Sequence, residues 1–187
     1  MITHALTHSG FVQRTLPLLK IVFGSILLAL SAKLCVPLWF TPVPVTMQTA
    51  ALLGLGVFLG PRLAFASALL YLLEGAAGLP VFATASSSIL VLVGPTAGYL
   101  WAFPFAAYLV GVLVRKAHHP LEVLVSVALS NFVILLAGTA WLAFSLGWTT
   151  AFTLGLSPFI PGALFKTALL FSLIYLTKAG NSYFTKK

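Results

Sequence analysis

Clusters of Gly and Pro divide this 187-residue chain into six long apolar stretches that contain very few charged side chains. Only 6% of the residues are charged, against roughly 25% in soluble domains, so the chain cannot present a water-facing surface all round. In a bilayer every backbone polar group must be bonded within the protein, and a helix of about 20 apolar residues achieves this. We therefore predict an all-α integral membrane protein with six transmembrane helices.

The predicted helices occupy about residues 16–36, 46–60, 63–78, 96–116, 121–144 and 159–178. The second and third are short. Gly60-Pro61-Arg62 between them fits a tight hairpin, because Pro is favoured at the first position of a helix. We expect one membrane domain, residues 16–178, between two cytoplasmic tails, residues 1–15 and 179–187.

Positive charges indicate the orientation, because Lys and Arg in short loops stay on the cytoplasmic side. Eight of them fall on alternate connections: Arg14, Lys20, Arg62, Arg115, Lys116, Lys178, Lys186 and Lys187. The intervening connections, residues 37–45, 79–95 and 145–158, have none. Both termini are therefore expected on the cytoplasmic side of the cytoplasmic (inner) membrane. This asymmetry accounts for the net charge of +8, so we expect no nucleic-acid partner.

The first apolar run has an alternative interpretation as a secretory signal peptide, since Arg14 and Lys20 are followed by small residues at Ala29 and Ser31. Its removal would spoil the charge alternation, so we expect the first helix to be retained. The single cysteine, Cys35, excludes an internal disulfide and a Cys-based metal cluster.

Three charged residues lie inside the apolar runs: Lys33, Glu74 and Lys166. A charge near the bilayer centre costs ~2.5–3.5 kcal/mol, so it is retained where it has a partner or a function. A rise of about 1.5 Å per residue places all three in the middle or outer half of the membrane. We predict an outward-facing polar pocket walled by the first, third and sixth predicted helices. Two alternatives stay open: Lys33 snorkels to the interface, and Glu74 pairs with Lys166 as a structural tie.

The uncharged outer connections are predicted to roof this pocket. Residues 37–45 include three prolines, which stiffen the segment and reduce the entropy lost when it closes over a ligand. Residues 79–95 offer hydroxyls and small side chains near Phe82 and Tyr99. Irregular backbone at membrane depth is tolerated where it lines a cavity or is buried in protein. Simple re-entrant packing is the alternative for both connections.

The sequence does not contain a catalytic motif. Lys166-Thr167 resembles the end of a Walker A motif, but Phe165 stands where the glycine must be. The four histidines all lie outside the predicted spans. We therefore expect no enzymatic activity, no cofactor and no bound metal.

Four segments carry a resemblance to a known family: residues 42–49 (PVPVTMQT), 71–83 (YLLEGAAGLPVFA), 94–99 (GPTAGY) and 158–162 (PFIPG), the last followed by Lys166. In this order they resemble the BioY family, the biotin-specific S-components of energy-coupling factor (ECF) transporters. The resemblance implies a six-helix protein that captures biotin near the outer face. It also implies a transmembrane T-component and two ABC-type ATPases as partners.

Biotin combines an apolar bicycle, a ureido group and a carboxylate. Lys166 would supply either a partner for the carboxylate or a donor to the ureido oxygen. The candidate substrate-binding residues are Lys166, Glu74, Thr46, Gln48, Phe82, Ser87, Thr96, Tyr99 and Trp39. In this family the first helix docks on the T-component through Ala-x-x-x-Ala. Ser25 and Ala29 are the nearest match, although the same spacing equally serves packing within the bundle.

The chain departs from the family pattern at two places. Ala163 stands where the family usually has Asp, three residues before the lysine of the sixth predicted helix. An expected acceptor for the ureido N–H groups is therefore missing. Residues 84–88 replace a loop that is usually Gly-rich. Glu74 is a hypothetical substitute acceptor. An alternative function is an ion-coupled secondary transporter of a related small carboxylated vitamin, with Glu74 as its titrating group.

Overall fold

The computed structural model describes residues 2–83 and 89–177, with side chains from residue 15 onward. The elements are α1 (Ile2–Lys33), β1 (Cys35–Val36), β2 (Val45–Thr46), α2 (Gln48–Leu59), α3 (Pro61–Ala76), the 3₁₀ turn η1 (Ile89–Leu92), α4 (Ala97–Lys116), α5 (Pro120–Leu146), α6 (Trp148–Ala151), the π-helical η2 (Phe152–Leu156), the 3₁₀ turn η3 (Ser157–Phe159) and α7 (Ile160–Leu176). The predicted site residue Ser87 and the predicted tail 179–187 lie outside the described residues.

Four helical segments of the described chain are long and apolar enough to cross a membrane: Thr15–Lys33, Ala97–Lys116, Pro120–Leu146 and Trp148–Leu176. They correspond to the first, fourth, fifth and sixth predicted helices. The helices α2 and α3 have 12 and 16 residues, so length and composition alone do not mark them as spans. The chain is thus a helical, multi-pass membrane protein, as predicted.

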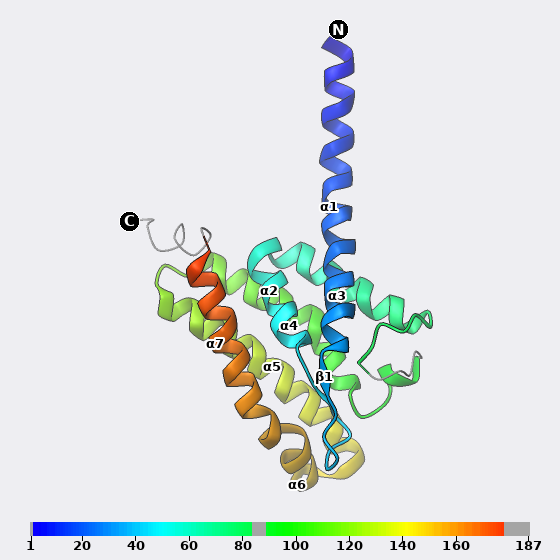
Figure 1. Ribbon diagram of the computed structural model, residues 1–187, viewed down its shortest axis with the longest axis vertical. Helices are drawn as coiled ribbons and strands as arrows, with labels where there is room; N and C mark the ends of the chain where they lie inside the picture. The colour runs from blue at the N-terminus through cyan, green and yellow to red at the C-terminus, as the bar shows by residue number, and fades with distance from the viewer. Residues whose placement is uncertain (1, 84–88, 178–187) are drawn as a thin grey trace.

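Helix α1 differs from the prediction at both ends. It begins well before residue 16 and continues through Pro17. Figure 1 shows its N-terminal half extending away from the other helices. At the other end it stops at Lys33, because β1 pairs antiparallel with β2, Cys35 lying opposite Thr46. Residues 37–45, which were predicted to roof the pocket, therefore belong to the loop end of a short hairpin.

The predicted hairpin at Gly60-Pro61 is confirmed. Gly60 has a φ of 88°, a left-handed conformation that favours glycine, and the guanidinium of Arg115 packs where a Cβ would lie. Pro61 is the first residue of α3, where its missing N–H is not needed by the helix.

The connection between α5 and α7 is more regular than the sequence indicates. Helix α5 ends at Leu146, Gly147 caps it with a φ of 78°, and α6, η2 and η3 follow directly. These short helical pieces lead into α7 at the lower end of the bundle in Figure 1.

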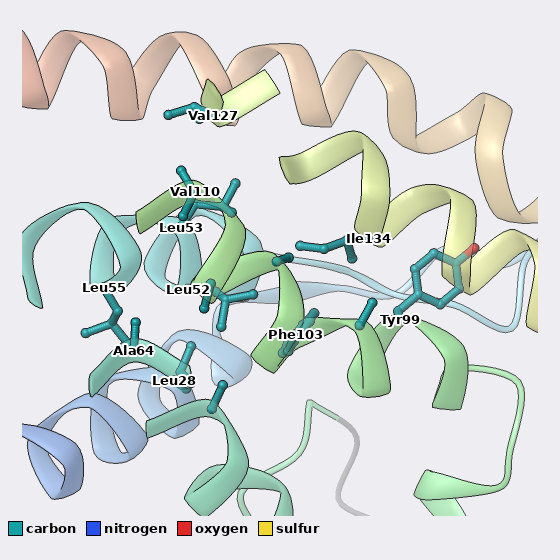
Figure 2. Packing of buried hydrophobic residues seen from close by; sticks show 14 of the residues in the cluster. Leu28, Leu52, Leu53, Leu55, Ala64, Tyr99, Phe103, Val110, Val127 and Ile134 are labelled. Carbon is teal, nitrogen blue, oxygen red and sulfur yellow. The ribbon is translucent and has the colours of Figure 1, made fainter. Parts of the chain in front are cut away.

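The core is centred on α4, which packs against α2, α3 and α5. Helices α2 and α4 cross closely: a Cβ on Gly111 would lie 2.8 Å from the carbonyl oxygen of Gly56. Small residues permit such approaches between membrane helices. Figure 2 shows the buried cluster, with Phe103, Ile134 and Tyr99 at its pocket end. The packing of α4 at the centre brings one end each of α2, α5 and α7 together around one cavity.

Candidate substrate pocket

A cavity lies where the β hairpin, α2, α4, α5 and α7 converge. The cavity itself has a volume of about 90 Å³. Together with the open space at its mouth, the empty volume is about 800 Å³. Its lining is Val43, Pro44, Val45, Thr46, Gln48, Thr49, Phe82, Ala83, Val91, Thr96, Tyr99, Leu100, Phe103, Asn131, Ile134, Leu135, Phe159, Gly162, Ala163 and Lys166. The walls are thus largely apolar, with a few polar groups from separate helices, as is typical of small-molecule sites.

Lys166 is the one charged side chain among the described residues of this lining. It lies in the second turn of α7, and the structure gives its ammonium neither an ion pair nor a hydrogen bond within the described residues. Ala163, one turn earlier, also lines the cavity and adds no acceptor. An unpaired cation in an apolar surrounding attracts an anionic or strongly polar ligand group.

Gln48 is held in place by a relay to a neighbouring helix. Its amide Nε2 donates to the hydroxyl of Tyr71 at 2.6 Å, and that hydroxyl donates to the carbonyl of Val81 at 3.3 Å. Gln48 and Tyr71 are almost completely buried. The relay therefore orients a polar side chain of the lining before any ligand arrives.

Phe82 lines the cavity with a fully buried ring. The ring meets that of Tyr71 edge to face, with centroids 5.5 Å apart and an interplanar angle of 89°. It also lies directly over Gly75, where an added Cβ would collide with it. A glycine at this position of α3 is thus what admits the ring.

Tyr99 is positioned from the opposite side. Its hydroxyl donates to the carbonyl of Gly155 in η2 at 2.6 Å, and its ring rests against Gly138 of α5. The ring of Phe159 lies at a centroid distance of 6.2 Å. The connection between α5 and α7 is thereby fixed to the first turn of α4.

Two polar residues of the lining, Asn131 and Thr49, were not among the predicted contacts. Asn131 of α5 donates to the carbonyl of Ala163 at 3.2 Å and to the hydroxyl of Thr167 at 3.4 Å, and it thereby joins α5 to α7. Thr49 has a buried hydroxyl with no hydrogen-bond partner among the described residues. It lies in the first turn of α2, where no preceding helical carbonyl accepts it. The motif at 42–49 contained this residue, but only the cavity singles it out.

The predicted contacts divide into three groups. Lining the cavity are Lys166, Thr46, Gln48, Phe82, Thr96 and Tyr99. Ser87 lies outside the described residues. Trp39 and Glu74 are not in the lining.

Trp39 is 96% exposed in the hairpin loop, where its ring meets that of Phe40 edge to face. Val43 and Pro44 of the same loop line the cavity, whereas Trp39 does not. The prediction for Trp39 thus differs from its place in the structure.

Glu74 faces α1 instead of the cavity. Its Oε1 accepts a hydrogen bond of 3.0 Å from the hydroxyl of Ser25, which is fully buried. Ser25, expected as a docking residue, is therefore covered by α3, whereas Ala29 is half-buried. Tyr71 and Gly75 lie on a different side of α3, which packs against Phe82. One helical position of about 100° separates the two sides.

Proteins of known name resemble this chain over most of its length. The sequence matches the BioY family over residues 5–181. The "Probable biotin transporter BioY" of Pyrococcus horikoshii is 40% identical over 127 residues, which cover 68% of this chain and 75% of that protein. The "Biotin transporter BioY2" of Lactococcus lactis subsp. cremoris is 34% identical over 176 residues, covering 88% and 93%.

The fold is also shared with a solved structure. The S-component for biotin from an ECF-type ABC transporter matches with a TM-score of 0.76 at 24% identity, covering 91% of this chain and 97% of that one. Sequence and fold agree over nearly the whole chain, and the protein belongs to the BioY family.

Proposed function

We propose that this protein captures biotin from outside the cell as the membrane substrate-binding (S) subunit of an ECF transporter. The family, the relatives named as biotin transporters and the fold of a biotin S-component support this. The observation that carries the proposal is the ammonium of Lys166, which has no ion pair or hydrogen bond within the described residues and is the one charge among the described lining residues. Holding this charge at membrane depth costs free energy that a polar ligand offsets.

The lining suits the parts of biotin. Phe82, Tyr99 and Phe103 provide apolar walls for the bicycle and the aliphatic chain. Lys166 meets a polar or anionic end of the ligand, while Gln48 and Thr49 offer polar groups from the first turn of α2. The buried Thr49 hydroxyl gains a partner when the ligand binds, which recovers part of its desolvation cost.

Transport energy comes from partner subunits in this proposal. The protein works with a T-component and two ABC-type ATPases and is itself no enzyme. The helices α2 and α3 complete six spans, with both termini in the cytoplasm and the pocket facing outward. The half-exposed side of α1 around Ala29 contributes to docking on the T-component, since small residues permit close helix approach.

The direct test is a biotin titration of the purified protein in detergent. Biotin at 100 times its Kd is expected to stabilise the fold by about 2.7 kcal/mol. Lys166→Ala should weaken binding about 10- to 100-fold without lowering the stability of the ligand-free protein, because its ammonium has no partner to lose. Lys20→Ala, an exposed lysine of α1 outside this cavity, is the control. No stabilisation of the parent by biotin would overturn the proposal.

Uptake in cells separates this function from ion-coupled transport. Accumulation of labelled biotin should require active ATPase subunits. Accumulation that instead persists without them and collapses with the proton or sodium gradient would favour the secondary transporter.

A further inference from the structure

Three consecutive backbone carbonyls beside the pocket are each bonded by a side chain from a different element. We call residues 81–83 the wall segment. The hydroxyl of Tyr71 donates to Val81, the ammonium of Lys33 donates to Phe82 at 2.9 Å, and the thiol of Cys35 donates to Ala83 at 3.7 Å. The wall segment is thus fixed from α3, from the end of α1 and from β1.

The bond from Lys33 is the strongest of the three. A hydrogen bond from an ammonium is roughly twice as strong as one between neutral groups, and a thiol is a weak donor. Lys33 lies in the last turn of α1, where a cation is also favoured by the helix dipole. Neither Lys33 nor Cys35 lines the cavity.

The bond from Lys33 affects the cavity through the wall segment. Phe82 and Ala83 both line it, and the ring of Phe82 is confined between Tyr71 and Gly75. A displacement of the Phe82 carbonyl therefore moves a ring that has no free space to take up the change.

We infer that Lys33 is a positioning residue for the pocket: by holding the Phe82 carbonyl it sets ligand affinity without touching the ligand. The affinity part of this inference rests on the proposed function. The structural part concerns the ligand-free protein and stands apart from it.

The main experiment compares Lys33→Met, which keeps the apolar stem but removes the donor, with Lys33→Arg, which keeps a cationic donor. Lys33→Met should bind biotin about tenfold more weakly, chiefly through faster dissociation, and Lys33→Arg should bind within about threefold of the parent. Lys20→Met controls for loss of a lysine on the same helix. Lys33→Leu, which also lacks a donor, carries the same expectation if the Met variant does not fold.

Cys35 provides a second readout, because it is the single cysteine and bonds the wall segment next to Phe82. Its rate of reaction with a maleimide is measured without biotin. The rate should rise several-fold in Lys33→Met at a temperature well below unfolding of every variant, and stay at the parent level in Lys33→Arg and Lys20→Met. A merely global loss of stability would not give this pattern.

Two results would overturn the inference: a Lys33→Met variant that labels at the parent rate, or a Lys33→Arg variant that behaves like Lys33→Met. A parent protein that does not bind biotin would refute the proposed function instead, and the labelling rates would still decide the role of Lys33.

Discussion

The amide of Gln48 donates a 2.6 Å hydrogen bond to the hydroxyl of Tyr71, and this pair joins the cavity to the wall segment. Gln48 lines the cavity, whereas Tyr71 lies behind it and bonds Val81. One hydroxyl thus orients a pocket side chain and holds a loop at the same time.

Tyr71→Phe tests this pair. The substitution leaves the Gln48 amide and the Val81 carbonyl without a partner in a buried site, at a cost of about 1–3 kcal/mol. Thermal unfolding of the ligand-free protein should show that loss, and calorimetry should show weaker biotin binding. Parent-like values in both measurements would mean that the relay does not contribute.

Gly75→Ala should displace Phe82 from the cavity wall. The new Cβ collides with the Phe82 ring, and overpacking of this kind costs about 1–3 kcal/mol. Both stability and biotin affinity should fall. Gly54→Ala is a matched control, because its Cβ would lie 3.6 Å from Leu170, an ordinary contact, and alanine favours a helix by about 0.5–1 kcal/mol. Equal effects of the two substitutions would contradict the prediction.

Ala163→Asp should tighten biotin binding about tenfold. The aspartate returns the acceptor that the family pattern usually has, and a charged acceptor contributes about 1.5–3 kcal/mol per hydrogen bond. The bond from Asn131 to the backbone of residue 163 does not depend on the side chain. Ala163→Leu, which adds similar bulk without an acceptor, should weaken binding. Weaker binding by Ala163→Asp, measured by calorimetry, would mean that the aspartate neutralises Lys166 instead of meeting the ligand.

Glu74→Gln should leave biotin affinity within about twofold of the parent, because Glu74 bonds Ser25 and is outside the cavity lining. The glutamine keeps an oxygen for that hydroxyl. Ser25→Ala should lower stability by about 0.5–1.5 kcal/mol through the lost interhelical bond, again with unchanged affinity. A tenfold loss of affinity in Glu74→Gln would restore the hypothesis that Glu74 is the substitute ureido acceptor.

Much of the fold follows from local signals in the sequence. The bounds of α4, α5 and α7 agree with prediction to within a few residues, because charge and Gly or Pro mark the ends of long apolar runs. The hairpin at Gly60-Pro61 was predicted for the same kind of reason. The helical pieces between Gly147 and α7 were not, because their uncharged, mixed sequence lacks a strong signal for helix or loop.

The sequence predicted less well which residues line the cavity. The motif residues Thr46, Gln48 and Thr96 line the cavity, whereas Trp39 and Glu74 do not. A membrane helix is apolar on all sides, so its sequence does not distinguish the face toward lipid from the face toward a cavity. Of two adjacent residues, Glu74 therefore faces α1, whereas Gly75 packs against Phe82.

The sequence by itself determined the class of the protein and most helix ends, because both depend on residues close together along the chain. Only the tertiary structure decided which groups meet: Lys33 with the Phe82 carbonyl, Ser25 with Glu74, and Gln48 with Tyr71. These pairs join residues far apart in the sequence. A buried polar atom bonds whatever donor or acceptor the packing brings within about 3 Å, and that choice depends on how all the helices pack together.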